Sequence, residues 1–326
     1  MSERRFARGS TAKPGGMLPE RATDAPIAAG QLAPAAQVTP AALAARARAC
    51  ARVLARHPRL VAGGALLLLM TVVAAFAPWL TPYDPESVNP QERLLPPGEA
   101  HPMGTDRYGR DVFSRVVYGA RTSLLVGWSV MVGVTLLGGG LGLLASSSHR
   151  ADRTLMRVVD GLMAFPDVLL AIALMAVLGS NVVNVIAALT VVYTPRMARV
   201  VRAAALSVLE EPYIEAARAA GATSARVLWR HVLPGAIPSA AVQATFLFAY
   251  AVLAEAALSF LGVGAPPYVP SWGNIINEGQ LYVRRAPWIV TYPGVAVVLT
   301  VLGLNMIGDD LRDWLDPRLR SKQDKR

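Results

Sequence analysis

Six apolar segments, each long enough to cross a lipid bilayer, limit the folds open to this chain more than any other feature. They cover residues 61–80, 121–145, 158–178, 182–206, 236–261 and 287–308. A helix rises about 1.5 Å per residue, so roughly 20 apolar residues cross the hydrocarbon of a bilayer. With 53% hydrophobic residues and a mean hydropathy of +0.39, the chain is too apolar for a soluble domain of its size. We therefore predict an all-α integral membrane protein with six transmembrane helices.

Two of these segments carry residues that are unusual in a membrane span. The fourth segment is the least apolar, because Arg196, Arg199 and Arg202 crowd its later half. We expect these arginines to reach an aqueous side or to face the protein interior. The second segment contains the glycine-rich run 138–142, which we expect to allow a neighbouring helix to pack closely.

Basic residues divide unevenly between the two sides of these segments. With the N-terminus in the cytoplasm, 25 of the 32 lysines and arginines lie inside and 7 outside. This positive-inside distribution predicts that both termini are cytoplasmic, because the inverted topology would place most arginines outside. The net charge of +10 therefore reports orientation and contact with membrane lipid. Basic residues do not alternate with exposed aromatics along a stripe, so we expect no nucleic-acid partner.

The residue types that most enzymes and metal sites need are missing or scattered. There is no G-x-x-x-x-G-K-[ST] phosphate loop, and Lys13, Lys322 and Lys325 all lie in the tails. No two of the four histidines have the spacing of metal ligands. The single cysteine, Cys50, excludes an internal disulfide. We expect no catalytic residue, no metal site and no cofactor bound by this chain.

Composition divides the chain into four parts. Residues 1–56 are expected to form a largely disordered cytoplasmic tail, with a basic helix at 41–56 that is either surface-lying or solvated. Residues 57–120 hold the first span and a proline-rich outer segment, in which an amphipathic helix is expected to begin near Asp106. Residues 121–308 form a core of five spans, and 309–326 a cytoplasmic C-terminal tail.

One polar loop, near residues 208–235, interrupts the apolar core with the sequence EAARAAGATSARVLWRHVLP. Pro212 suits the first turn of a helix, where its missing N–H would be unpaired anyway. Glu215 then lies near the positive end of the helix dipole. Gly221 can take the left-handed conformation that ends a helix.

A second short helix is predicted after this turn. Thr223 or Ser224 can cap its start, and Pro234 is expected to end it. The loop would then consist of two short helices at an angle, whose alanines allow close approach by a partner. The alternative is an ordinary surface helix–turn–helix between two spans.

This loop resembles the EAA loop of ATP-binding-cassette (ABC) importer permeases. Their signature is Glu-Ala-Ala, three residues, Gly, nine residues, an apolar position, one residue and Leu-Pro. The matching residues are Glu215, Ala216, Ala217, Gly221, Leu233 and Pro234, with His231 at the apolar position. Further blocks resemble the second-permease type of the dipeptide, oligopeptide and nickel subfamily, in the same order along the chain. They lie at 101–124, 160–171, 255–264, 270–276 and 308–320.

The resemblance covers roughly residues 57–320 and implies a type I ABC importer permease fold in the bacterial inner membrane. It implies the six signature residues as the site that couples the permease to its ATPases. The implied partners are a second permease subunit, most often a paralogue, two ABC ATPase subunits that use ATP and Mg, and an extracytoplasmic substrate-binding protein. The implied cargo is di- or oligopeptides, with nickel or glutathione as alternatives.

Three residues within the predicted spans are candidates for the lining or gate of a transport pathway: Asp160, Pro166 and Glu255. Asp160 and Asp167 flank Pro166, which frees the carbonyl of Leu162 and can kink the third span. A kinked helix lining a pathway is one interpretation of Asp160 and Pro166, and ordinary bundle packing is the other. Glu255 falls late in the fifth span, where it either meets headgroup water, pairs locally, or lines the pathway or its outer gate.

The chain departs from the subfamily pattern at two places, and two other classes of protein remain as rivals. Gly235 stands where the subfamily commonly has Asn, and the N-terminal tail is longer than usual. An ion-coupled secondary transporter would favour paired carboxylates near the midplane and inverted repeats, which the sequence does not clearly contain. A membrane scaffold or membrane-embedded enzyme is the other rival. The sequence does not determine the substrate.

Overall fold

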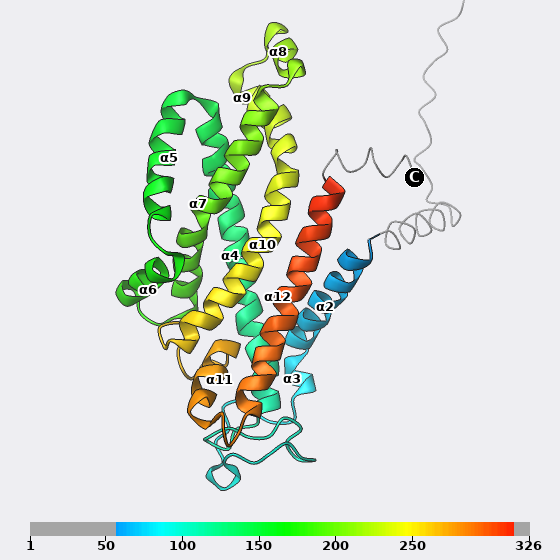
Figure 1. The fold of residues 1–326 in the computed structure, drawn as a ribbon, viewed down its shortest axis with the longest axis vertical. Helices are drawn as coiled ribbons and strands as arrows, with labels where there is room; N and C mark the ends of the chain where they lie inside the picture. Colours follow the sequence, from blue (N-terminus) through cyan, green and yellow to red (C-terminus); the bar gives the residue numbers. More distant parts are fainter. Residues whose placement is uncertain (1–56, 316–326) are drawn as a thin grey trace, which may run out of the picture. The chain divides into compact units, whose positions relative to one another are not determined.

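A computed structural model describes residues 57–315, and every regular element in that range is a helix (Figure 1). The predictions for residues 1–56, including the basic helix at 41–56, and for residues 316–326 lie outside this range. The long helices are α2 (Pro58–Ala75), α4 (Val112–Ser147), α7 (Val182–Leu209), α10 (Leu233–Phe260) and α12 (Trp288–Leu315). The shorter helices are α3 (Ala77–Leu80), α5 (His149–Met163), α6 (Asp167–Leu178), α8 (Pro212–Ala219), α9 (Ser224–Val227) and α11 (Trp272–Gly279).

Within residues 57–315, four helical stretches are long and apolar enough to cross a membrane. They are α2, α4, the stretch Ser224–Phe260 that ends with α10, and α12. A fifth span results if α5 and α6 are taken together. Helix α7 has 28 residues, but its arginines lower its hydropathy. The structure thus confirms an all-α membrane fold, whereas the count of six spans stays a prediction.

The third predicted span, residues 158–178, is broken rather than continuous. Helix α5 ends at Met163, α6 begins at Asp167, and the two are bent by 90°. Pro166 lies directly before α6 as its N-cap residue. At Pro166, where a kink was expected, the chain instead forms two separate helices at 90° to each other.

Glycines in the second span allow α4 and α7 to pack at short range, as expected. A Cβ built at Gly138 would lie 2.7 Å from the Thr194 carbonyl oxygen, and one at Gly142 would lie 2.6 Å from that of Ala198. Both glycines therefore face the backbone of α7, and close helix approach through small residues is a common packing mode in membranes. Gly139, between them, has nothing within 4 Å of such a Cβ.

The outer segment before α4 differs from the prediction at its helix start. We expected a helix from about Asp106, but α4 begins at Val112. Asp106 instead holds a turn, because its Oδ1 accepts the N–H groups of Tyr108 and Arg110 at 2.7 and 3.0 Å. Asp111 is the actual N-cap, and its Oδ2 accepts the N–H of Ser114 at 2.7 Å.

Figure 1 places most connections between helices toward two opposite ends of the bundle, while the turn between α5 and α6 lies partway along its side. One end carries α8 and α9, and both the start of α2 and the end of α12 lie toward it. The other end carries α3, α11 and the segment before α4. This arrangement agrees with the predicted topology, in which the polar loop and both termini are cytoplasmic, but assigning either end to the cytoplasm stays a prediction.

Candidate functional site

The first half of the polar loop is the helix α8, which begins and ends as its sequence predicts. Pro212 occupies its first turn and Glu215 is the acidic residue of that turn. The N–H of Gly221 donates to the Arg218 carbonyl at 2.9 Å, and the N–H of Ala222 donates to the Ala217 carbonyl at 3.0 Å. This is the Schellman arrangement of helix ends, and Gly221 takes the left-handed φ of +86° that it requires.

The second half of the loop differs from the prediction. Thr223 caps α9, because its Oγ1 accepts the N–H of Arg226 at 3.3 Å. The helix does not end at Pro234, however. It continues through a π-helical turn, Leu228–Val232, into α10, and Pro234 lies in the first turn of that helix. Because a helix tolerates proline in its first turn, the change of helix type at Val232 accommodates Pro234 without a break.

Three apolar side chains fix this loop to the bundle. Ile214 of α8, Val227 of α9 and Val232 of the π-helical turn are all 2% exposed or less. Glu215 and Ala216 are exposed, and Ala217 is half-buried. The loop therefore has a buried anchor and a free face of small and charged residues, at one end of the bundle (Figure 1).

The six signature residues do not form a single patch. Glu215, Ala216, Ala217 and Gly221 lie together on α8 and its C-terminal turn. Leu233, which is half-buried, and Pro234, which is exposed, instead begin α10. They follow the π-helical turn, so their role in the fold is to connect the loop to the long helix.

Asp160 and Asp167, on either side of Pro166, both pair with arginines of α7. Three aspartates of the broken pair α5/α6 form ion pairs with the three arginines of α7. The pairs are Asp152–Arg202, Asp160–Arg199 and Asp167–Arg196. The arginines were expected to reach water or the protein interior, but their partners were not predicted. Their spacing of three residues, which places them along one helix face, was the available signal.

These ion pairs remain accessible to water. Asp160 lies 2.7 Å from Arg199, with side chains 60% and 49% exposed. A charge facing hydrocarbon costs roughly 2.5–3.5 kcal/mol on insertion scales. Because α5 and α7 carry such charges on exposed surface, that surface is suited to contact with water or another protein subunit.

Glu255 lies inside the bundle. Its side chain is 0% exposed, so it does not meet headgroup water, and a place at the outer gate stays a prediction. Its Oε2 accepts the Ser123 hydroxyl and its Oε1 accepts the Ser259 hydroxyl, both at 2.8 Å. Of the possibilities left open by the sequence, local pairing is confirmed. The Ser123 hydroxyl connects α10 to α4 at this level, whereas Ser259 lies on α10 itself.

A second buried charge network, at the opposite end from α8, was missed in the sequence. Arg115 donates to Asp106 and to Glu278 of α11, each at 2.6 Å. Arg110 donates to Asp106 at 2.7 Å and also to Glu278. Two positive and two negative charges are thus balanced where the outer segment meets α4 and α11. An arginine as buried as Arg115, 1% exposed, needs such partners, but sequence alone does not reveal which they are.

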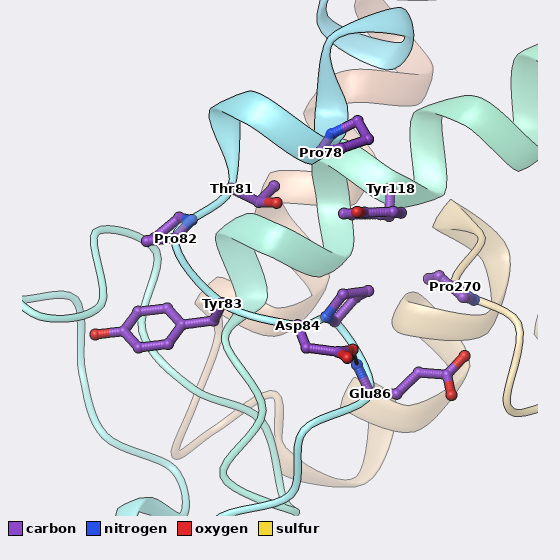
Figure 2. Close-up of a pocket in the computed structure, with 9 residues that line it drawn as sticks. Pro78, Thr81, Pro82, Tyr83, Asp84, Glu86, Tyr118 and Pro270 are labelled. Atoms are coloured by element: carbon purple, nitrogen blue, oxygen red, sulfur yellow. Dashed lines mark hydrogen bonds between the residues drawn. The ribbon is translucent and has the colours of Figure 1, made fainter.

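The same end of the bundle carries an open groove of about 570 Å³ (Figure 2). Its walls come from the chain after α3, from Tyr118 of α4 and from Pro270 before α11. Figure 2 shows Asp84 and Glu86 on this surface, and both carboxylates are exposed. The groove is therefore a polar feature of the end that lies away from the polar loop.

The helical bundle, its apolar spans and the exposed loop between α7 and α10 define a multi-pass membrane protein. Residues 135–321 match the family described as binding-protein-dependent transport system inner membrane component, and the chain belongs to that family. Residues 48–97 match the N-terminal TM domain of oligopeptide transport permease C. The chain is thus a permease component of an ABC transporter, located in the inner membrane. This membership contradicts the two rival interpretations of the sequence, an ion-coupled secondary transporter and a membrane scaffold or membrane-embedded enzyme.

Several curated relatives cover most of the chain. A Brucella abortus protein, named as a peptide transport system permease, is 48% identical over 83% of this chain and 91% of its own length. The dipeptide transport system permease protein of Alkalihalophilus pseudofirmus is 42% identical over 80% and 86%. The glutathione transport system permease protein of Pectobacterium atrosepticum is 44% identical over 80% and 87%.

A solved structure supports the fold. A chain of the MetNI methionine ABC transporter in an inward-facing conformation superposes with a TM-score of 0.54 at 23% identity. The match covers 62% of this chain and 96% of that chain. It confirms the predicted type I importer permease fold.

Proposed function

We propose that this chain forms part of a translocation pathway for di- or oligopeptides, driven by two ATPase subunits, one of which docks on α8. The observation that carries the proposal is the construction of α8. It is held to the bundle by the fully buried Ile214, ends in the left-handed turn at Gly221, and keeps its free face exposed. A rigidly anchored helix with a slim outer face is suited to transmitting force from a partner.

Each signature residue has a proposed role in this coupling. Ala216 and Ala217 keep the docking face slim, and Glu215 supplies a charge at its start. Gly221 permits the chain reversal. Leu233 and Pro234 connect the moving loop to α10, so a shift of α8 reaches a membrane span directly.

The remaining subunits complete the transporter. ATP and Mg are used by the ATPase subunits, while this chain binds neither. A second permease subunit, a paralogue of this chain, supplies the other side of the pathway. An extracytoplasmic binding protein delivers peptide at the end that carries the groove beside Asp84 and Glu86, opposite the coupling loop.

The candidate pathway residues take different roles in this proposal. Asp160 lines the pathway, because its ion pair with Arg199 is open to water. Pro166 sets the direction of α6. Glu255 holds α4 and α10 together near the outer gate rather than lining the path, since its carboxylate is sealed within the bundle.

Peptides are the favoured cargo because the relatives named above include peptide and dipeptide permeases. Glutathione is a second candidate, favoured by a glutathione permease at 44% identity. Uptake by proteoliposomes that contain both permeases, the ATPases and the binding protein would separate the two. Trialanine and glutathione, each labelled, are suitable substrates, and uptake of neither would contradict the proposed cargo class.

Site-directed crosslinking tests the coupling role. Cys50 is the only cysteine, so a Cys50→Ser background allows single cysteines to be introduced. Ala219→Cys, on the exposed end of α8, should crosslink to an ATPase subunit in the purified complex, with an efficiency that changes on ATP addition. Glu99→Cys, exposed in the outer segment, is the matched control and should not. Labelling of Ala219→Cys from the cell exterior would contradict the assignment.

A further inference from the structure

One polar cluster of the bundle lies far from both of its ends. Arg196 is the fifteenth of 28 residues in α7, so it stands about 21 Å from the start of that helix. It pairs with Asp167, in the first turn of α6 directly after the 90° break. Charged groups within a membrane bundle are costly, and they commonly mark a functional path.

Two tyrosine rings complete the cluster. The Arg196 guanidinium lies 5.6 Å from the ring centroid of Tyr193 and 5.3 Å from that of Tyr250 on α10. The two rings are themselves 6.4 Å apart. Three separate elements, α6, α7 and α10, thus bring a carboxylate, a guanidinium and two aromatic rings together.

Backbone groups add further polarity at the same level. Pro195, inside α7, has no N–H, so the carbonyl of Val191 lacks its helical donor. Pro166 offers no side-chain cap to α6, which leaves first-turn N–H groups of that helix unpaired by a cap. Proline therefore alters the backbone hydrogen bonding of α7 and α6 next to each member of the ion pair.

The ion pair is open enough to exchange partners. The Arg196 and Asp167 side chains are 34% and 33% exposed, respectively. The outer network differs, because Arg115 and Asp106 are each 1% exposed and sealed in place. A half-open pair can admit a ligand that carries both charges, and such a ligand replaces one ion pair with two while the total charge stays zero.

We propose that Asp167, Arg196, Tyr193 and Tyr250 form a binding station in the transport pathway for zwitterionic peptides. Asp167 holds the terminal ammonium and Arg196 holds the terminal carboxylate. The exposed ring of Tyr250 contacts the chain between them, and the buried ring of Tyr193 supports the Arg196 guanidinium. Recognition of the two termini tolerates any side chain, which suits a transporter of varied peptides. This inference rests on the peptide cargo proposed above.

Direct binding to the purified permease–ATPase complex, without the binding protein, tests the station. Labelled trialanine should bind saturably, and unlabelled trialanine should compete with it. Trialanine acetylated at its N-terminus and amidated at its C-terminus should compete at least about tenfold more weakly, since it lacks both charges. Equal competition by the blocked peptide, or no saturable binding to the wild-type complex, would overturn the proposal.

Variants separate binding from a structural role. Arg196→Gln and Asp167→Asn should each weaken trialanine binding at least about tenfold, with Arg196→Lys retaining more of it. Arg202→Gln removes the ion pair with Asp152 between α5 and α7 and should bind like the wild type. The melting temperatures of all four variants should lie close together. If Arg196→Gln and Arg202→Gln lose binding and melting temperature alike, the pair is structural and the station is excluded.

Peptide uptake distinguishes failure of this inference from failure of the proposed function. If wild-type proteoliposomes take up trialanine and the Arg196→Gln variant takes it up equally well, the binding station is excluded and the proposed function stands. A wild-type complex that takes up no peptide would remove the peptide cargo and the station with it.

Discussion

Gly221 combines a conformation that disfavours side chains with a position that has room for one. Its φ is +86°, in the left-handed region, and nothing lies within 4 Å of a Cβ built on it. Under the proposed docking, a substitution here is opposed by backbone strain and by the ATPase subunit, rather than by a clash within this chain. That separation allows the two effects to be measured independently.

We expect Gly221→Asp to abolish ATP-driven uptake while insertion and assembly remain roughly intact. A β-carbon at this φ costs about 1–2 kcal/mol, and the charge would also enter the docking surface. Gly221→Asn is the matched control, because Asn has a similar size, no charge and a better tolerance of the left-handed region. It should retain more uptake in proteoliposomes. If Gly221→Asp transports normally, the coupling assignment is wrong.

Glu255 should act through its hydrogen bonds, since both carboxylate oxygens accept buried hydroxyls. Glu255→Leu would leave the Ser123 and Ser259 hydroxyls without this acceptor, at about 1–3 kcal/mol for each unpaired group. Glu255→Gln keeps one oxygen acceptor and nearly the same shape. Thermal unfolding in detergent should therefore show a clear loss of stability for Glu255→Leu and a small one for Glu255→Gln. Equal losses would show that the negative charge itself is required.

The contact between α4 and α7 depends on which face of α4 each glycine occupies. Gly138 and Gly142, four residues apart, meet carbonyl oxygens of α7, whereas Gly139 and Gly140 have nothing within 4 Å of a Cβ. Carbonyls of a packed helix cannot move aside as a flexible side chain can. The two pairs of glycines therefore provide a test within one short stretch of one helix.

We expect Gly138→Ala and Gly142→Ala to lower the thermal stability of the detergent-solubilised protein by forcing α4 and α7 apart. Gly139→Ala and Gly140→Ala should leave it unchanged or raise it by about 0.5–1 kcal/mol, since alanine favours helix over glycine. Differential scanning fluorimetry of the four variants makes this comparison. A loss at Gly139 as large as that at Gly138 would contradict the packing.

For the broken pair α5/α6, the sequence predicted a kink but not its angle. Pro166 predicted a kink, because proline removes a helical hydrogen bond. The 90° angle, however, also needs the partners that hold each half in place, Arg202 and Arg199 for α5 and Arg196 for α6. These pairs join residues 29 to 50 positions apart, so no local pattern contains them.

One buried charge network joins the outer segment to the helical bundle, so its loss should affect the stability of the whole molecule. It consists of Asp106, Arg110, Arg115 and Glu278. We expect Arg115→Met to destabilise the protein by about 3–5 kcal/mol, because it leaves buried carboxylates partly uncompensated. Arg121→Met removes an exposed arginine further along α4 and should have little effect. Proteolysis of the outer segment and thermal unfolding report the difference. Comparable behaviour of the two variants would contradict a structural role for the network.

Sequence alone determined the features that arise within a few residues of each other. The apolar lengths indicated a membrane-spanning helical protein, the spacing of Glu215, Gly221 and Pro234 indicated a loop like that of ABC permeases, and proline and glycine marked the ends of α8. The cap at Thr223 follows the same local chemistry, whereas the start of α4 was placed several residues early and its cap, Asp111, was missed. These features depend on helix geometry and nearby hydrogen bonds, which are encoded in consecutive residues.

Only the tertiary structure decided which distant groups meet. It enclosed Glu255 among serines, carried the helix on past Pro234 into α10, and paired the arginines of α7 with aspartates on both sides of the break. The physical reason is that a charge in an apolar bundle must find a partner or reach water, and its partner is selected by helix packing in three dimensions rather than by its neighbours in the chain.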